Sequence, residues 1–319
     1  VVGAGPAGLT VAELLGREGH CVTVFDQWPD GGGELRYGTP RFKLDHRLVQ
    51  TRLDCLRTLG VEFVFDTRVG DGAGVDALFS SGFEAVFLGT GAGRPFRPGI
   101  PGETLEGVHL GTEFLVRANV EQNRRPSELE EPPSVGARVA VLGGGELAVD
   151  CARTALRLGA TEVTCHFEGT EDEMTGNLRE RAFAREEGVV FEFQAAAVRM
   201  VDDLKGRIRG VELQRLASSP ANGGNGGSHR EPAPYHLPAD SVVLALGRSP
   251  DPSLVLETHG LTAGPSGLLR VDPATGRTER ERVWAGGGNV TGPAPVGEAV
   301  AQARAAARDI HDCLAATSA

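Results

Sequence analysis

The sequence predicts an α/β fold with two Rossmann-like domains, and three observations lead to this prediction. Residues 1–15 and residues 138–158 each show an apolar strand, a glycine-rich turn and an amphipathic helical pattern. In both stretches a second apolar strand follows and ends at an acidic residue. The same order of elements recurs after about 140 residues, so two related domains are expected.

The first glycine turn has the residues that a dinucleotide requires. Gly3 permits a tight turn, Gly5 lets a pyrophosphate approach the backbone, and Gly8 lets the helix pack closely on the sheet. The helix begins near Pro6 and Ala7, where free N–H groups and a partial positive charge face the phosphates. A lone G-x-G-x-x-G is a weak signal and fits a turn without a ligand, but the full order of elements favours a dinucleotide site.

The second turn repeats the pattern as G-x-G-x-x-A, at Gly143, Gly145 and Ala148. Each unit then closes on an acid, Asp26 after strand 22–25 and Glu168 after strand 163–167. In a dinucleotide-binding fold, an acid about twenty residues after the motif hydrogen-bonds the adenosine ribose.

Composition and length restrict the function. The 319 residues suffice for two domains, 40% of them are hydrophobic, and the formal net charge is −11. With this charge and no long basic run, nucleic acid is an unexpected partner. No apolar run approaches the roughly 20 residues of a membrane helix, so no membrane partner is expected. Only two residues precede the first turn, fewer than a normal strand of about 5–6, so further residues are expected upstream.

The five cysteines are scattered and form no C-x-x-C pair. This usage is typical of a reducing compartment such as the cytoplasm and disfavours a cysteine-bound metal, so no metal site is expected. The eight histidines form no recognisable constellation, and no nucleophile elbow is present.

Between the two motifs the sequence predicts further elements. The glycine-rich stretch 31–44 is expected to cover a flat ring with backbone. Residues 45–59 fit a helix, with one apolar face formed by Leu48, Leu53, Leu56 and Leu59. Strands are expected at 61–65, 83–91, 138–142 and 241–247, and a long helix at 296–314. Residues 94–103 read as a crossover between domains, 120–134 as a surface loop, and 216–234 as a flexible low-complexity loop.

In this order, the stretches resemble two-dinucleotide flavoprotein reductases and, more closely, the small (beta) subunit of bacterial glutamate synthase and its relatives. The resemblance spans essentially the whole chain. It is carried by the first glycine turn with Leu9, by Y-G-T-P-R-F-K-L at 37–44, by the glycines at 143–145, and by 150–160, 237–240 and the C-terminal glycine turn.

The resemblance implies a glutathione-reductase-type architecture in which the second domain is inserted in the first. Residues 1–104 and 250–319 would form a discontinuous FAD-binding domain, and residues 105–249 an NAD(P)-binding domain. It also implies roles for single residues, with the glycine turn holding the FAD pyrophosphate and Asp26 its ribose. The remaining FAD contacts would be Gly33, Leu35, Val69, Thr90, Gly91, Gly287, Gly288 and Val296.

The family passes hydride directly from nicotinamide to flavin, so no catalytic side chain is assigned. Electrons would go on to a small-molecule substrate or a protein electron acceptor, because the cysteines that ligate iron–sulfur clusters upstream in the glutamate synthase subunit do not appear in this sequence. A larger subunit of a complex is the alternative partner.

Four departures from the family pattern affect the function. The family usually has an Arg pair where this chain reads Glu168–Gly169, and a carboxylate there favours NADH over NADPH. Glu146 replaces an Asn at the start of the phosphate-binding helix, where it would compete with the pyrophosphate. Gly288 replaces an Asp that bonds the flavin's ribityl–phosphate region, and Glu34 replaces an apolar residue near the flavin.

Three hypotheses follow from these features. The first is an FAD-dependent oxidoreductase that uses NADH, with NADPH as the less favoured donor. The second is an FAD oxidase or dehydrogenase whose nicotinamide domain is degenerate, and the third a non-catalytic flavin-binding subunit of a larger complex. The three hypotheses differ in how much flavin the isolated protein binds and in whether NADH reduces that flavin.

Overall fold

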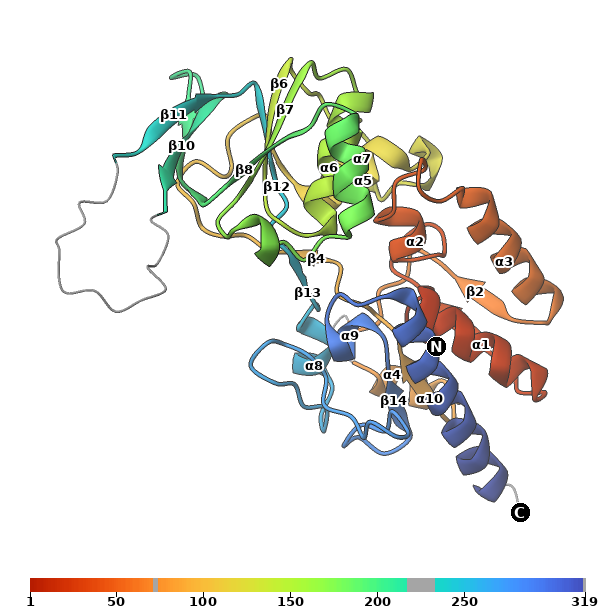
Figure 1. Ribbon diagram of the computed structural model, residues 1–319. Helices are drawn as coiled ribbons and strands as arrows, with labels where there is room; N and C mark the ends of the chain where they lie inside the picture. Colours follow the sequence, from red (N-terminus) through yellow and green to blue (C-terminus); the bar gives the residue numbers. More distant parts are fainter. Residues whose placement is uncertain (71–73, 217–232, 318–319) are drawn as a thin grey trace, which may run out of the picture. The chain divides into compact units, whose positions relative to one another are not determined.

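The computed structural model describes residues 1–70, 74–216 and 233–317 of the chain. The chain divides into two compact units (Figure 1). Unit 1 comprises Val1–Arg94, Asn119–Glu130 and Arg248–Ala319, and unit 2 comprises Pro95–Ala118 and Glu131–Gly247. The part of the predicted flexible loop between 217 and 232 lies outside the described residues.

The first predicted domain boundary, at 104/105, differs from the observed division. Residues 95–104 belong to unit 2. Ile100 packs against a core cluster of that unit, and the N–H of Met200 donates to the carbonyl oxygen of Pro101 at 2.8 Å. The prolines therefore end the first unit earlier than expected and lead directly into the packing of the second.

The second difference concerns residues 119–130, most of which fall in the surface loop that the sequence predicts at 120–134, within the expected second domain. They form two single-turn 3-10 helices, Gln122–Arg124 and Ser127–Leu129, and belong to unit 1. Arg124 forms an ion pair with Asp30, and its carbonyl oxygen accepts a hydrogen bond from the Tyr37 hydroxyl at 3.2 Å. The segment lies largely on the surface, as predicted, but it belongs to the other unit, because polarity reports exposure and not the ion pairs that a segment makes.

Unit 1 contains a parallel sheet in which Val2 joins two pairs of strands. This residue forms parallel bridges to both Phe25 and Leu88, so it lies between the pair β1–β2 and the pair β3–β14. The strands are short because each ends at a glycine or polar turn. They are β1 (Thr23–Phe25), β2 (Glu62–Val64), β3 (Val86–Leu88) and β14 (Val283–Ala285), with β4 (Arg94–Pro95) and β13 (Arg248–Ser249) pairing where the chain leaves and re-enters the unit.

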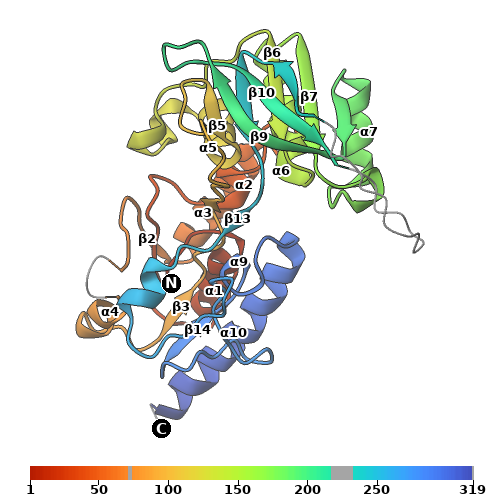
Figure 2. The same ribbon diagram turned by 90° about the vertical axis from the view of Figure 1, so that its left-hand side faces the viewer.

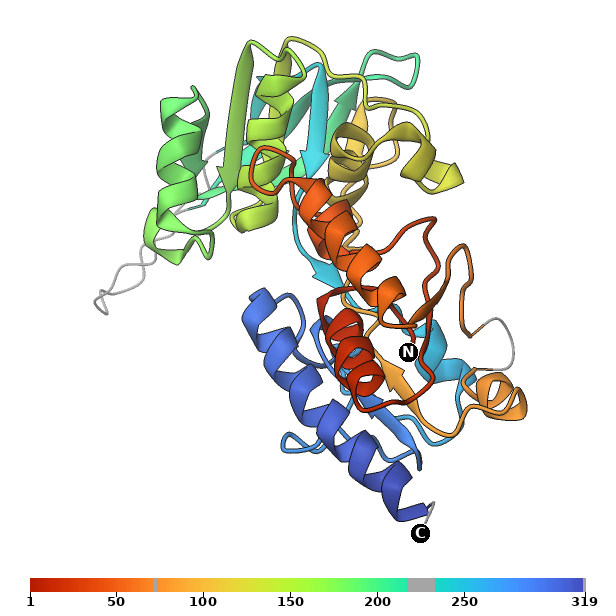
Figure 3. The same cartoon turned by 90° about the vertical axis from the view of Figure 1, so that its right-hand side faces the viewer.

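Helices cover the sheet of unit 1. The α1 and α10 helices lie side by side (Figures 1 and 3), and their apolar residues share one core cluster with Val24, Phe87 and Trp284. A second cluster, which includes Val2 and Leu88, contains residues of the shorter helices. The helices are α1 (Pro6–Arg17), α2 (Glu34–Tyr37), α3 (His46–Thr58), α4 (Asp76–Ser80), α8 (Ser253–Glu257), α9 (Gly288–Thr291) and α10 (Val296–Thr317).

The α3 helix confirms the predicted helix but not its complete apolar face. Leu53 and Leu56 are buried as expected, whereas Leu48 is 64% exposed. Val49 is buried in its place, because the spacing 49, 53, 56 follows the 3.6-residue period more closely. The Asp45 side chain caps the helix by accepting a hydrogen bond from the N–H of Arg47 at 2.9 Å.

Unit 2 contains a five-stranded parallel sheet in the order β5-β12-β6-β7-β8 and a three-stranded antiparallel sheet, β11-β10-β9. The two sheets share an apolar cluster, and helices cover the other face of the parallel sheet (Figure 2). The elements are β5 (Val108–Leu110), α5 (Gly111–Asn119), β6 (Arg138–Leu142), α6 (Glu146–Arg157), β7 (Glu162–Phe167), α7 (Leu178–Glu186), β8 (Val190–Phe193), β9 (Ala195–Asp202), β10 (Ile208–Arg215), β11 (Tyr235–Pro238) and β12 (Ser241–Leu244).

Candidate dinucleotide sites

The first glycine turn leaves no room for a side chain at Gly3 or Gly8. A Cβ built on Gly3, whose φ is +101°, would lie 2.4 Å from the carbonyl oxygen of Gly89. A Cβ on Gly8 would lie 1.9 Å from the carbonyl oxygen of Gly3. Gly5 is the N-cap residue of α1, and no side chain caps this helix. The first N–H groups of α1 are therefore left for a ligand, as the sequence predicts for a phosphate.

Several predicted site residues, distant in sequence, converge on this helix N-terminus. Gly33, with φ +52°, lies against Gly5, because a Cβ on Gly33 would be 2.7 Å from the Gly5 Cα. Gly287, with φ +83°, lies against Ala7, with a corresponding distance of 3.0 Å to its Cβ. Backbone thus approaches backbone at the start of α1 from two other turns.

The C-terminal turn is also tightly packed. A Cβ on Gly288 would lie 3.5 Å from the carbonyl carbon of Gly91 and 3.1 Å from the next backbone nitrogen. Thr90, one residue earlier, is exposed. The passage at 90–91 and the turn at 287–288 therefore adjoin, although they are about 200 residues apart.

Asp26 directly follows β1 and is bonded to the glycine turn. Its carboxylate accepts hydrogen bonds from the N–H of Ala4 at 2.6 Å and from the N–H of Trp28 at 3.0 Å. Burial raises the pKa of Asp26, and these two backbone hydrogen bonds oppose the rise. The side chain thus joins the turn to the end of β1, where a ribose hydroxyl would be bound.

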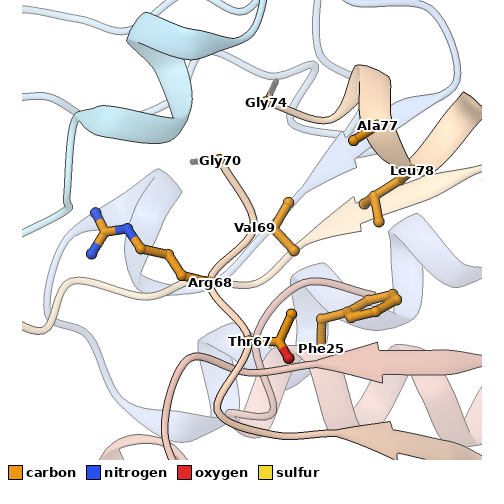
Figure 4. A pocket seen from close by; sticks show the side chains of 8 residues that line it. All are labelled: Phe25, Thr67, Arg68, Val69, Gly70, Gly74, Ala77 and Leu78. Atoms are coloured by element: carbon orange, nitrogen blue, oxygen red, sulfur yellow. The ribbon is translucent and has the colours of Figure 1, made fainter. Parts of the chain in front are cut away.

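Val69 lines a pocket of about 210 Å³ at the end of β1 (Figure 4). Its lining residues are Phe25, Thr67, Arg68, Val69, Gly70, Gly74, Ala77 and Leu78. Apart from the threonine and the arginine the lining is apolar, which suits a flat aromatic base. Sequence reasoning found only Val69 in this group, because the other residues carry no motif and come together through the fold.

The glycine-rich stretch 31–44 is held by buried charges that sequence reasoning missed. Asp30 forms ion pairs with Arg124 and, at 3.4 Å, with Arg36, while Arg36 also donates to the carbonyl oxygen of Gly31 at 2.7 Å. The side chains of Asp30 and Arg36 are 9% and 4% exposed. Tyr37, whose pKa is raised by burial, donates to the Asp30 carbonyl oxygen at 3.2 Å. The network fixes the backbone that carries Gly33 and the half-buried Leu35.

The structure shows the surroundings of two residues that depart from the family pattern, Gly288 and Glu34. Asn289 is 1% exposed, and its side-chain amide donates to the carbonyl oxygen of Leu88 at 2.8 Å. The Asn289 side chain is thus directed into the sheet. Glu34 begins α2 and forms an ion pair with Arg248. Val296, the first residue of α10, is 41% exposed.

The second glycine turn has the same construction in unit 2. A Cβ on Gly143, with φ +143°, would lie 2.2 Å from the carbonyl oxygen of Ala245. The Phe167 ring lies over Gly144, 2.2 Å from the position a Cβ would take there. Gly145 is the N-cap residue of α6, again with no side-chain cap, and Ala148 is fully buried. The turn therefore offers unsatisfied N–H groups to a ligand.

The charges around this second turn are acidic. Glu146 is the first residue of α6 and is exposed, and Glu168 is exposed directly after β7. Three more carboxylates follow between 171 and 173. One of them, Glu171, is paired with Arg185 at 2.5 Å. Gly176 lies beside Gly145, since a Cβ on Gly176 would be 3.4 Å from the Gly145 carbonyl carbon. The segment after β7 thus adjoins the N-terminus of α6.

Two buried titratable groups lie within β7. Burial lowers the pKa of His166 to about 4 and raises the pKa of the Cys165 thiol to about 12. His166 is 3% exposed, and its Nε2 lies 3.1 Å from the Thr164 hydroxyl. Both side chains are packed inside the unit and are structural. Within the described ranges, no three His, Cys, Asp or Glu side chains come together to hold a metal, and no helix is long and apolar enough to span a membrane.

Comparison with known sequences identifies the family. A sequence profile described as pyridine nucleotide-disulphide oxidoreductase matches residues 1–303. The oxidoreductase AegA of Escherichia coli K12 is 38% identical over 331 residues, which is 100% of this chain and 49% of AegA. The NADPH glutamate synthase small chain of the same organism is 35% identical, over 98% of this chain and 68% of its own length. The chain thus spans about half of AegA and two thirds of the synthase subunit.

Solved structures show the same fold. Mycobacterium tuberculosis FprA in complex with NADPH matches with a TM-score of 0.77 at 19% identity, covering 99% of this chain and 84% of FprA. Thioredoxin reductase of T. acidophilum matches with a TM-score of 0.71 at 18% identity, covering 98% and 97%. The predicted α/β fold with two Rossmann-like domains is confirmed, as is the resemblance to the glutamate synthase small subunit. The chain therefore belongs to the pyridine nucleotide-disulphide oxidoreductase family, whose members are flavin-dependent NAD(P)H oxidoreductases.

Proposed function

We propose that unit 1 binds FAD and unit 2 binds a nicotinamide nucleotide, with NADH preferred over NADPH. The convergence of Gly33 and Gly287 on the uncapped N-terminus of α1 carries the FAD assignment. A pyrophosphate fits there because backbone N–H groups are available and no side chain intrudes. The pocket at Val69 suits the adenine, and Asp26 suits its ribose.

When bound, FAD accepts hydride from the nicotinamide and passes electrons to the acceptor. The contribution of the chain is then to bind and orient the two nucleotides. The proposed contacts in unit 1 are Gly3, Gly5, Pro6, Ala7, Gly8, Asp26, Gly33, Leu35, Val69, Thr90, Gly91, Gly287, Gly288 and Val296. In unit 2 they are Gly143, Gly145, Glu146, Ala148 and Glu168.

The NADH preference rests on the acidic end of β7. Glu168 is exposed where the ribose of a bound nucleotide would lie, and the carboxylates at 171–173 are close in sequence. A carboxylate accepts hydrogen bonds from a ribose diol and repels a 2′-phosphate. The printed names of the glutamate synthase relatives specify NADPH, so this chain would differ from them in its donor.

The test is an anaerobic titration of the FAD-loaded protein with NADH and with NADPH, following the flavin absorbance. NADH should bleach the flavin at a concentration at least tenfold below that of NADPH. In Glu168→Arg this ratio should move toward NADPH by at least tenfold, equivalent to about 1.4 kcal/mol. The control is Glu162→Arg, which places the same charge at the other, exposed end of β7. An unchanged ratio in Glu168→Arg would refute the assignment.

Glu146 supports a second candidate, an FAD oxidase or dehydrogenase that does not use nicotinamide. An exposed carboxylate at the first position of α6 competes with the pyrophosphate for the same N–H groups. This candidate predicts bound flavin that neither nucleotide bleaches, and recovery of bleaching in Glu146→Asn. Little flavin on the isolated chain, together with a stable complex on co-purification, would instead support the non-catalytic subunit.

The electron acceptor is proposed to be a small molecule or a protein. The relatives include the small chain of glutamate synthase and the beta subunit of a formate dehydrogenase from Moorella thermoacetica, which are subunits of larger enzymes. A larger-subunit partner for this chain is therefore the alternative. Co-purification of the tagged chain from its native cells distinguishes the two, since a stoichiometric second subunit appears only in the latter case.

A further inference from the structure

Glu34 and Arg248 form an ion pair at one end of the glycine-rich stretch of unit 1. Glu34 directly follows Gly33, the residue that lies on Gly5. Its carboxylate lies over Gly38, where a Cβ would be 2.0 Å from Oε1, and its Oε2 contacts the Arg248 guanidinium. The side chain of Arg248 is 18% exposed and that of Glu34 is 44% exposed. The pair is thus shielded on the arginine side and open on the glutamate side.

Glu34 lies in the chain between Gly33 and Leu35, two of the proposed flavin contacts. A reduced flavin carries negative charge, which a nearby carboxylate destabilises and a nearby guanidinium stabilises. Of the other charged side chains nearby in sequence, Arg36 is paired with Asp30, and Arg41 is paired with Glu121. Glu34 and Arg248 therefore form a separate pair of opposite charges beside the proposed flavin contacts.

We propose that the Glu34–Arg248 ion pair tunes the reduction potential of the flavin, with Glu34 lowering the potential and Arg248 compensating. This inference rests on the proposed binding of FAD by unit 1. The two residues act through their charges and do not exchange protons or electrons with the substrate. Removing one charge should therefore shift the potential in one direction, and removing the other should shift it in the opposite direction.

The experiment uses the FAD-loaded full chain in equilibrium with a reference redox dye at low ionic strength. The variants are Glu34→Gln, Arg248→Gln and the double variant. At a fixed dye ratio, Glu34→Gln should raise the ratio of reduced to oxidised flavin at least threefold, and Arg248→Gln should lower it at least threefold. Threefold corresponds to roughly 15 mV for two electrons. The double variant should lie within twofold of the unsubstituted protein, and high salt should reduce both shifts.

The matched control is the Asp76–Arg280 pair of the same unit, with a contact of 2.6 Å and exposures of 50% and 34%. Asp76→Asn and Arg280→Gln should leave the flavin ratio unchanged. Glu34→Leu, which removes the same charge with a different side chain, should match Glu34→Gln and shows that the shift comes from the charge. Shifts in the same direction for both charge removals, or no shift, would overturn the inference. A protein that binds no FAD would overturn the proposed function instead.

Discussion

Replacement of Asp30 by alanine should destabilise unit 1 more than the loss of any exposed ion pair would. The substitution removes the only carboxylate that pairs with Arg36 in the described structure, and the Arg36 side chain is 4% exposed. Burial already lowers the pKa of Arg36, which shows that its charge is poorly solvated. Breaking a buried pair by removing one partner costs about 3–5 kcal/mol. We therefore expect Asp30→Ala to lower the free energy of unfolding by about 3 kcal/mol or more.

Two comparisons test this magnitude. Arg124→Ala removes a partner that is 31% exposed and leaves the Asp30–Arg36 contact in place, so about 1–2 kcal/mol is expected. Asp76→Ala breaks an exposed pair and should cost at most about 1 kcal/mol. The order of the three variants, with Asp30 the most damaging, follows from burial alone.

The assay is urea-induced unfolding followed by tryptophan fluorescence. The chain has two tryptophans, and both lie in unit 1. Trp28 packs edge-on against Tyr37 with ring centroids 4.0 Å apart, next to Asp30, so the signal reports the unit that contains the network. A decrease of less than about 1 kcal/mol in the free energy of unfolding of Asp30→Ala would refute the reasoning. It would mean that Arg36 is solvated or finds another counter-charge.

Three further predictions concern single sites. Gly8→Ala places a Cβ 1.9 Å from the Gly3 carbonyl oxygen, so it should abolish FAD retention on gel filtration. His166, with a folded pKa of about 4 against about 6.5 unfolded, stays neutral in the fold while the unfolded chain binds a proton. Stability should therefore fall by about 2–3 kcal/mol as pH drops from 7 to 4.5, measured by urea unfolding in circular dichroism. At pH 8 iodoacetamide should modify exposed Cys21 and spare Cys165, as read by mass spectrometry.

Each of these has a control. Gly93→Ala, where a Cβ meets nothing within 4 Å, should retain FAD, and equal loss in both glycine variants would contradict the packing argument. His166→Gln should reduce the pH dependence below pH 6.5, with a remainder from His46 and His109, whose pKa values burial also lowers. An unchanged profile would assign the dependence to those other groups. Modification of Cys165 in the native protein as fast as in urea would show that β7 is not buried in solution.

The sequence by itself determined the fold class, because the evidence for it is local. Glycines at a fixed spacing between an apolar strand and an amphipathic helix are compatible with few local structures. The turns Gly3 to Gly8 and Gly143 to Ala148 therefore each predict one Rossmann-like unit. The helix at α3 and the long helix α10 followed from periodicity in the same way. Asp26 and Glu168 could be located because each directly follows the second strand of its unit.

Only the tertiary structure decided which distant residues meet. Nothing in the sequence around Arg124 indicates that it pairs with Asp30, so the predicted domain 105–249 includes residues 119–130, which belong to unit 1 in the structure. The same holds for the Glu34–Arg248 pair and for the pocket lined by Val69. The physical reason is that ion pairs and pockets form between side chains separated by tens to hundreds of residues. Periodicity and spacing describe neighbours along the chain, whereas these contacts depend on how the sheet brings separate turns together.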